Sequence, residues 1–195
     1  MVQLMKLPRW VFGASVLAVV GWQSHTEATV VRAMPLPELV SMSEWVVIAQ
    51  VQSSRSHYET IGGMRRMVTD TTLIVNEALS PNRSSSDVEM ATVVVRTLGG
   101  TMGEVAQLVP GEAVLTKGPN HLLFLDEASG DGIFRVAAMA QGQYLVNTDE
   151  KGVRTLRPSP GLDVVVNPTQ SAVAALAGRT VEQARALVTN ARKVP

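Results

Sequence analysis

The sequence predicts a mainly β fold: one small antiparallel barrel, with a short helix before it and an amphipathic helix after it. Segments rich in β-branched residues alternate in polarity and are separated by glycine- and proline-containing turns. Such short strands must protect their edges, and closure into a barrel does this within 195 residues. After residue 157 the periodicity becomes helical. One domain with helices at both ends is therefore expected.

The first elements are a short helix and a strand. In "MPLPELVSMSE", Pro35 and Pro37 stand where a helix starts, and the positions with helical spacing are Leu36, Leu39, Val40 and Ser43. The next segment, "WVVIAQVQSS", is β-branched, and its alternation places on one face Trp45, Val47, Ala49 and Val51. We expect this strand to begin the barrel.

A hairpin and further strands follow. The pair Gly62–Gly63 predicts a turn, after which "VTDTTLIVNEAL" alternates, with one side formed by Thr69, Thr71, Leu73 and Val75. Strands are also predicted in "MATVVVRTL", "HLLFLDE", "GIFRVAAMAQGQYLVN" and "KGVRTLRP", the third of them broken near Gln141–Gly142. The total is six or seven short strands.

The C-terminal part is predicted to be helical. "NPTQSAVAALAG" favours a short helix closed by Gly178. In "TVEQARALVTNAR", Thr180 and Gln183 have capping-box spacing, and an apolar line contains Val181, Ala184, Val188 and Ala191. A line of alanine and valine is more typical of a helix docked on its own domain than of one that binds a partner. We therefore divide the chain into a barrel at 29–157 and a helical extension at 158–195.

The N-terminus has the features of a secretory signal peptide at residues 1–28. Lys6 and Arg9 precede an apolar run of about thirteen residues, against roughly twenty for a membrane-spanning helix. Thr26 and Ala28 are the small residues expected before a cleavage site, and an uncleaved anchor is the alternative. The prediction is an exported protein, periplasmic or extracellular, with no stable membrane insertion after cleavage.

Composition excludes several classes of function. The formal net charge is zero, and cleavage after Ala28 leaves 15 basic against 16 acidic residues, about −1, so nucleic acid is not an expected partner. Aromatic residues make up 4% of the chain, too few for large stacking surfaces. The absence of cysteine excludes disulfides, a thiolate nucleophile and cysteine-bound zinc. No cofactor is expected.

The stretch "VRTLGGTMGEVAQLVPGE" has four glycines that suggest either a ligand loop or turns. It matches neither "GxxxxGK[ST]" nor a "GxGxxG" that opens a helix. Gly99–Gly100 is better explained as a barrel corner, and Pro110–Gly111 as a turn. Arg96 lies in the preceding strand and is a candidate ligand-binding residue whose partner the sequence does not identify.

Catalytic and metal candidates are few. His57 and His121 remain after signal cleavage, and with Asp70 and a serine they could form a hydrolytic triad, although neither "GxSxG" nor "SxxK" occurs. His57 is expected at the surface, and His121 at the rim of the barrel. The acidic run "DEASGDG" supplies possible metal ligands in Asp126, Glu127 and Asp131, but their spacing is not that of an EF-hand, and a hairpin turn is the alternative.

The order of strand segments resembles a group of uncharacterised bacterial exported proteins, which are similar in layout to the OB-like barrel of netrin modules and tissue inhibitors of metalloproteinases. The resemblance covers roughly residues 38–146 and rests on strand texture and the motifs "VRTLGG" and "MAQGQY". It implies an OB-like barrel. It carries over no site, because the inhibitors bind the target's zinc through an N-terminal cysteine that this chain lacks.

Two functional hypotheses remain. The first is an exported, non-catalytic binding or structural module that acts on a protein or an envelope component, favoured by the signal sequence and the absence of catalytic spacing. The second is a small exported hydrolase with a dispersed, histidine-dependent site at His57 or His121. The two differ in whether turnover depends on histidine.

Overall fold

The computed structural model describes residues 31–79, 91–127, 132–162, 165–166 and 168–193. The predicted signal peptide at 1–28 lies outside these residues. The elements, in chain order, are β1 (Val31–Arg32), α1 (Leu36–Met42), β2 (Trp45–Ile61), β3 (Met64–Ala78), β4 (Thr92–Leu98), β5 (Gly100–Met102), β6 (Val105–Gln107), β7 (Asn120–Asp126), β8 (Ile133–Val136), η1 (Met139–Gly142), β9 (Gln143–Thr148), β10 (Arg154–Pro158), β11 (Val165–Val166), η2 (Pro168–Gln170), α3 (Ala172–Leu176) and α4 (Val181–Arg192).

Five strands form a closed OB-like barrel, as predicted. The order around the barrel is β2, β3, β4, β8, β7 and back to β2. All neighbours are antiparallel except β4 and β8, which are parallel and pair only through Val94↔Ile133 and Val95↔Phe134. The junction of β8 with β7 is equally short, because these strands pair only through Leu125↔Val136 and Asp126↔Arg135. Beyond β7, the sheet continues through β9 to β10.

The barrel interior is filled by the faces that the alternation predicts. Val47, Ala49 and Val51 of β2 face Leu73 and Val75 of β3, and the remaining members of this cluster are Val93, Val95, Ala113, Leu123, Leu125, Phe134 and Val136. Trp45 packs against the same cluster. Burial of each valine, leucine or phenylalanine side chain in this cluster stabilises the fold by about 1.5–3 kcal/mol relative to exposure. The predicted inward faces of β2 and β3 are therefore confirmed.

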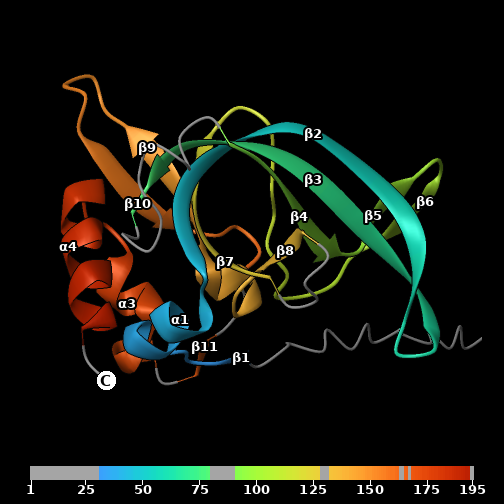
Figure 1. Cartoon of the computed structure of the whole chain (residues 1–195), viewed down its shortest axis with the longest axis horizontal. Helices are drawn as coiled ribbons and strands as arrows, with labels where there is room; N and C mark the ends of the chain where they lie inside the picture. Colours follow the sequence, from blue (N-terminus) through green and yellow to red (C-terminus); the bar gives the residue numbers. More distant parts are fainter. Residues whose placement is uncertain (1–30, 80–90, 128–131, 163–164, 167, 194–195) are drawn as a thin grey trace, which may run out of the picture.

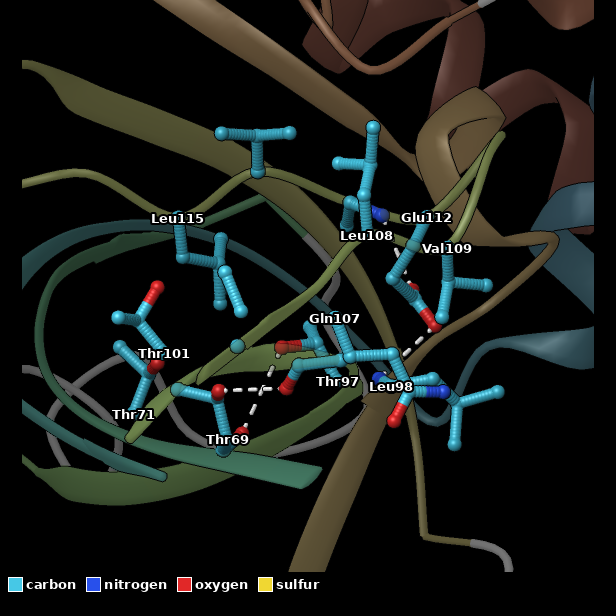
Figure 2. A pocket seen from close by; sticks show the side chains of 15 residues that line it. Thr69, Thr71, Thr97, Leu98, Thr101, Gln107, Leu108, Val109, Glu112 and Leu115 are labelled. Atoms are coloured by element: carbon cyan, nitrogen blue, oxygen red, sulfur yellow. Dashed lines mark hydrogen bonds between the residues drawn. The ribbon is translucent and has the colours of Figure 1, made fainter. Parts of the chain in front are cut away.

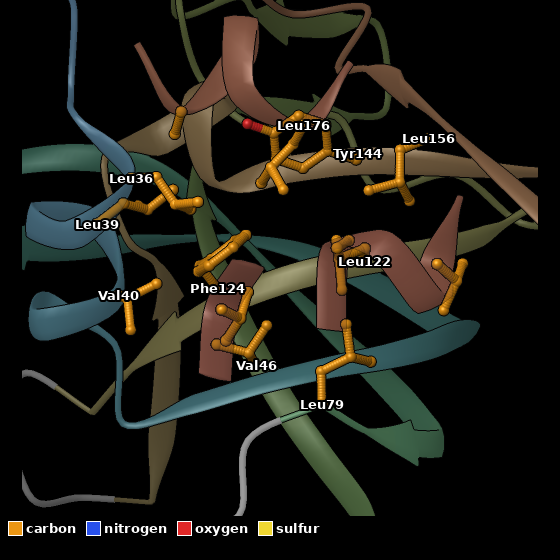
Figure 3. Packing of buried hydrophobic residues seen from close by; sticks show 14 of the residues in the cluster. Leu36, Leu39, Val40, Val46, Leu79, Leu122, Phe124, Tyr144, Leu156 and Leu176 are labelled. Atoms are coloured by element: carbon orange, nitrogen blue, oxygen red, sulfur yellow. The ribbon is translucent and has the colours of Figure 1, made fainter. Parts of the chain in front are cut away.

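A second apolar core joins the helices to the outside of the barrel (Figures 1 and 3). Leu39 and Val40 of α1 and Leu176 of α3 meet Phe124 of β7 and Tyr144 of β9. The predicted capping box at Thr180 and Gln183 starts α4, whose Val181, Ala184 and Val188 are buried in this core. None of the described helices has the length and apolar character needed to cross a bilayer.

The predicted break of the long strand near Gln141–Gly142 is confirmed, and it begins at Ala137 and ends with η1 at Gly142. β8 ends at Val136, and Ala138 and Met139 both adopt left-handed backbone (φ 54° and 55°), so the chain turns within this break. Such backbone is unfavourable for residues with a Cβ, and neither residue type signals it. Gln141 is buried, and its side-chain amide bonds the backbone of Met34 (2.9 Å) and Arg32 (3.0 Å).

Candidate functional site

One end of the barrel is lined by hydroxyl groups. Along β3 the inward positions change from Val75 and Leu73 to Thr71 and Thr69, and along β4 they change from Val93 and Val95 to Thr97. On β2, Ser54 and Ser56 stand opposite the β3 threonines, with Oγ–Oγ1 distances of 3.2 Å to Thr71 and 2.9 Å to Thr69. The three strands therefore change from aliphatic to hydroxyl side chains at the same level.

A cavity of about 280 Å³ opens at this end, and we call it the mouth cavity (Figure 2). Its walls come from the ends of β3 and β4, from the β5–β6 hairpin and from the segment 112–115 that crosses the barrel end. Its size is near the lower limit of ligand sites in proteins, roughly 300–1,000 Å³. The cavity is thus large enough for a small group or part of a chain.

The glycine pair of "VRTLGG" shapes one wall of the mouth cavity. Gly99 and Gly100 have φ of 84° and 138°, and a Cβ on Gly100 would overlap Thr69 Oγ1 and Ser56 Oγ. The Thr69 hydroxyl donates to the Gly99 carbonyl at 2.8 Å. Glycine is needed here because the chain turns the corner in direct contact with β2 and β3. The predicted corner is therefore confirmed, and it leads into the short β5–β6 hairpin.

The crossing segment 112–118 is held by side chains instead of by a neighbouring strand. The Gln143 Oε1 accepts the Val114 N–H at 2.7 Å, and its Nε2 donates to the Val114 carbonyl. His121 Nε2 lies 2.9 Å from the Thr116 carbonyl, and Gln50 Nε2 donates to Gly118 at 3.1 Å. The second motif of the resemblance, "MAQGQY", thus supplies a buried amide that fixes the wall of the cavity.

His121 lies in the protein interior, which corrects the expectation of a rim position. Its side chain is fully buried, with Nε2 at the Thr116 carbonyl and Nδ1 3.1 Å from Gln143 Nε2. The Gln143 amide donates, so Nδ1 accepts and Nε2 carries the proton. Burial lowers the pKa of His121, which favours the neutral ring. The histidine is a support of segment 112–118 and has no path to a substrate in this position.

Glu112 is a site residue that the sequence reasoning missed. Its carboxylate accepts the N–H of Leu98 at 3.0 Å and of Ala113 at 2.9 Å (Figure 2). Burial raises the pKa of this carboxyl group, and its two backbone donors and Arg135 oppose the rise. The carboxylate stands where β8 no longer pairs with β4, and so it takes the place of a strand partner for Leu98. In the sequence, an acidic residue after "PG" looks like an ordinary turn residue.

A second cavity of about 220 Å³ lies on the outer side of the same wall. Thr97, Leu98 and Glu112 line both cavities, and the outer one is completed by Ile61, Arg96, Arg135, Val136 and Met139. The end of β4 and the Glu112 side chain therefore separate an outer groove from the mouth cavity.

Three sequence candidates meet on the outer face of β2, β3 and β4. Arg96 donates to both carboxylate oxygens of Asp70, at 2.6 and 2.8 Å, and its Nη1 lies 2.5 Å from Glu59 Oε2. His57 Nε2 is 3.9 Å from Asp70 Oδ2. The bidentate bond from Arg96 is the main reason that the pKa of Asp70 is lowered. His121 is not part of this cluster.

The cluster is an ion-pair network that joins three strands. Asp70 is engaged by Arg96, and a triad instead needs its carboxylate to orient the histidine that activates the nucleophile. Among the described residues, no serine or threonine hydroxyl is hydrogen-bonded to a histidine ring nitrogen. The geometry fits an arginine held in place across three strands, 12% exposed at its side chain.

The candidate metal ligands are only partly described. Asp126 ends β7, and Glu127 accepts the Gly132 N–H at 2.8 Å, which is the bonding of a turn. Asp131 lies outside the described residues. Within the part of the chain that the structure describes, no group of three or more histidine or acidic residues is placed to hold a metal ion.

Exposed apolar side chains are concentrated on two hairpins at the end of the barrel that holds the mouth cavity (Figure 1). Seven large hydrophobic residues of the described chain are exposed. Four are on the β2–β3 and β5–β6 hairpins, namely Tyr58, Met64, Met102 and Val105, and a fifth, Leu108, directly follows β6 and lines the mouth cavity. We call these five the mouth surface. Both hairpins lie at the end of the molecule away from the helices (Figure 1). Leu108 is the most exposed of the five, at 89%.

No protein-family model, curated protein or solved structure matches the chain. The resemblance to exported proteins with netrin-like barrels stays a prediction.

Proposed function

We propose that this protein is an exported, non-catalytic module that binds a protein partner, in the cell envelope or outside the cell, through its mouth surface. The single observation that carries the proposal is the concentration of exposed apolar side chains on the two hairpins at the end of the barrel that holds the mouth cavity (Figure 1). Apolar patches are typical of interaction sites, and the flexible methionine side chain adapts well to a partner's shape. The predicted signal peptide supports export.

The environment of each candidate residue also favours a binding role over hydrolysis. His121 is buried and bonded at both ring nitrogens, and Asp70 is bound by Arg96. His57 is the one described histidine with substantial exposure, at 36% of its side chain. A histidine-dependent hydrolase therefore has one candidate base and, among the described residues, no paired nucleophile.

Site-specific photocrosslinking tests the proposal. A photoreactive amino acid placed at Leu108 in the full chain, expressed in its own cells, should give a defined adduct. A second probe at Met102 should give the same adduct. The matched control is Val153, which is 42% exposed in the β9–β10 connection, away from the mouth surface. Absence of an adduct at Leu108 and Met102, or the same adduct at all three positions, would contradict the proposal.

An activity screen tests the alternative. Purified protein is assayed against ester, peptide and glycoside substrates beside a His57→Ala variant, with circular dichroism to verify that the variant is folded. We expect no turnover from either protein. Turnover that disappears in His57→Ala would refute the non-catalytic assignment and favour the hydrolase.

A further inference from the structure

One edge of the crossing segment 112–118 is already satisfied. Gln143 bonds both the N–H and the carbonyl of Val114, and His121 bonds the carbonyl of Thr116, two residues further along. Hydrogen bonds on one side at every second residue are the pattern of an extended strand. The side chains of Ala113 and Leu115 pack into the barrel core, which agrees with the same alternation.

The opposite edge is open. In an extended segment, the N–H and carbonyl of Leu115 point away from the side on which Gln143 and His121 bind. Neither group of Leu115 hydrogen-bonds to another described residue, and Leu115 lines the mouth cavity. An unpaired strand edge is a template for pairing with another chain.

The β5–β6 hairpin presents a second open edge at the same cavity. Thr101 stands opposite Ala106, one position from the pair Met102↔Val105 that closes the two-residue turn. In a two-residue hairpin, residue pairs whose backbone groups hydrogen-bond each other alternate with pairs whose backbone groups point outward. Met102 and Val105 form a hydrogen-bonded pair, so the N–H and carbonyl of Ala106, in the next pair, point outward. The Thr101 N–H agrees with this, because it donates outward to Ser56 Oγ at 3.2 Å. Ala106 and Leu108 both line the cavity.

The lining also restricts the chemistry of an occupant. One wall carries the hydroxyls of Thr69, Thr71, Thr97 and Thr101, and the other carries apolar side chains that include Leu108, Val109 and Leu115. Glu112 is the one ionisable residue in the lining, and the lining has no cation. A neutral or basic group is therefore accepted more readily than an acidic one.

We propose that the mouth cavity accepts an extended peptide segment of the partner protein, which adds as a strand to the open edge at Leu115 and contacts the β6 edge at Ala106. Main-chain hydrogen bonds supply affinity in this mode, and alternate side chains supply specificity. The segment is neutral or basic, with small hydroxyl and apolar residues in alternation. This inference rests on the proposed function, because it names the part of the partner that the mouth surface binds.

The probe is a panel of capped nine-residue peptides in which threonine or serine alternates with valine, leucine or alanine. One series carries terminal lysines and a matched series carries terminal glutamates. Binding to the ¹⁵N-labelled protein from residue 29 is followed by the shifts of backbone amides. We expect shifts at Leu115 and Ala106, and tighter binding of the lysine series. No binding by any peptide up to 1 mM (about −4 kcal/mol) would overturn the proposal, and tighter glutamate binding would overturn its charge argument.

Two controls distinguish main-chain pairing from nonspecific apolar binding. The first control is a peptide from the panel that binds, resynthesised with N-methyl groups at alternate residues, which keeps its side chains and loses main-chain donors. It should bind at least about tenfold more weakly than the unmethylated peptide, because one or two hydrogen bonds are lost. Ala106→Pro removes one donor at an edge position that tolerates proline, with Ala106→Val as its matched control, while Leu115→Pro and Leu115→Val repeat the comparison. Equal binding to the proline and valine variants at both positions would overturn strand addition.

The outcomes separate this inference from the proposed function. An adduct at Leu108 without peptide binding leaves the proposed function standing and rejects strand addition. Peptide binding without an adduct at Leu108 supports strand addition at the mouth cavity and rejects the proposal that the mouth surface binds a protein partner in cells. Sedimentation of the purified chain, with and without Leu115→Pro, tests a second copy as occupant: self-association that the variant abolishes would overturn assignment of the groove to another protein.

Discussion

Replacement of Gln143 by leucine tests whether one buried amide holds the wall of the mouth cavity. The Gln143 side chain is fully buried and bonds the Val114 N–H, the Val114 carbonyl, His121 Nδ1 and the Ser159 hydroxyl. Leucine fills a similar volume but leaves these four groups without that partner. An unpaired buried polar group costs about 1–3 kcal/mol.

The lower value suits this site because segment 112–118 is near the surface and water can reach part of it. Four groups at about 1 kcal/mol each give about 4 kcal/mol, and the greater apolarity of leucine offsets about 1 kcal/mol of this. We therefore expect the free energy of unfolding of Gln143→Leu to fall by about 3 kcal/mol. This is a large part of the roughly 5–15 kcal/mol that stabilises a typical domain.

The assay is urea unfolding followed by fluorescence and circular dichroism, together with hydrogen exchange of the amides in segment 112–118. Gln107→Leu is the matched control, because this exposed glutamine accepts only a long bond from the Met67 N–H at 3.4 Å. Its effect should stay within about 0.5 kcal/mol. If Gln143→Leu also stays within that range, or exchange in the segment does not accelerate, then the packing of Ala113 and Leu115 holds the wall and our reasoning is wrong.

Three further predictions concern single residues. Gly100→Ala should lower the free energy of unfolding by more than about 2 kcal/mol in a urea titration, because the new Cβ would overlap Thr69 Oγ1. The control Gly103→Ala should cost only about 1 kcal/mol, because its Cβ would meet no atom within 4 Å and only the positive φ is unfavourable. Equal effects of the two substitutions would refute the contact with Thr69. Tyr144→Phe should raise the melting temperature by a few degrees, because the buried Tyr144 hydroxyl has no partner among the described residues, and a clear decrease would point to a bound water. Because the pKa of His121 is lowered in the folded protein, the unfolded chain binds a proton at this histidine more readily. The contribution of neutral His121 to the free energy of unfolding should therefore be full above about pH 6.5 and decrease as the pH falls towards the folded-state pKa. Unfolding titrations from pH 7.5 to 5 should show a steeper decrease for the wild type than for His121→Gln.

The mouth surface shows why net charge and composition say little about an interaction site. The chain has zero formal charge and ordinary hydrophobicity, values that favour no partner. In the structure, five of seven exposed large hydrophobic residues of the described chain lie on two hairpins, or directly after one of them, at one end of the barrel (Figure 1). Residues 58 and 64 are far from 102, 105 and 108 in sequence, and contact between β5 and the β2–β3 hairpin brings them to one end. Clustering of this kind is a property of the fold.

The sequence by itself determined the elements whose signals are local. Alternation fixed the inward faces of β2 and β3 because successive side chains of a strand point to opposite sides. The spacing of Thr180 and Gln183 predicted the start of α4 because a capping box closes within one turn. The corner at Gly99–Gly100 was predictable because glycine alone tolerates that backbone without strain. Each signal depends on neighbours within a few positions.

Only the tertiary structure decided the roles of Glu112, His121 and Gln143. Glu112 bonds Leu98, which is 14 residues away in the sequence, and Gln143 bonds Val114, which is 29 residues away. Strand pairing brings these residues together in space. Glutamate, histidine and glutamine are also common on protein surfaces, so the sequence predicted a rim position for His121. In the structure this residue is buried. A hydrogen bond requires two atoms to lie close together in space. For these residues, closure of the barrel sets that proximity, and local sequence patterns do not.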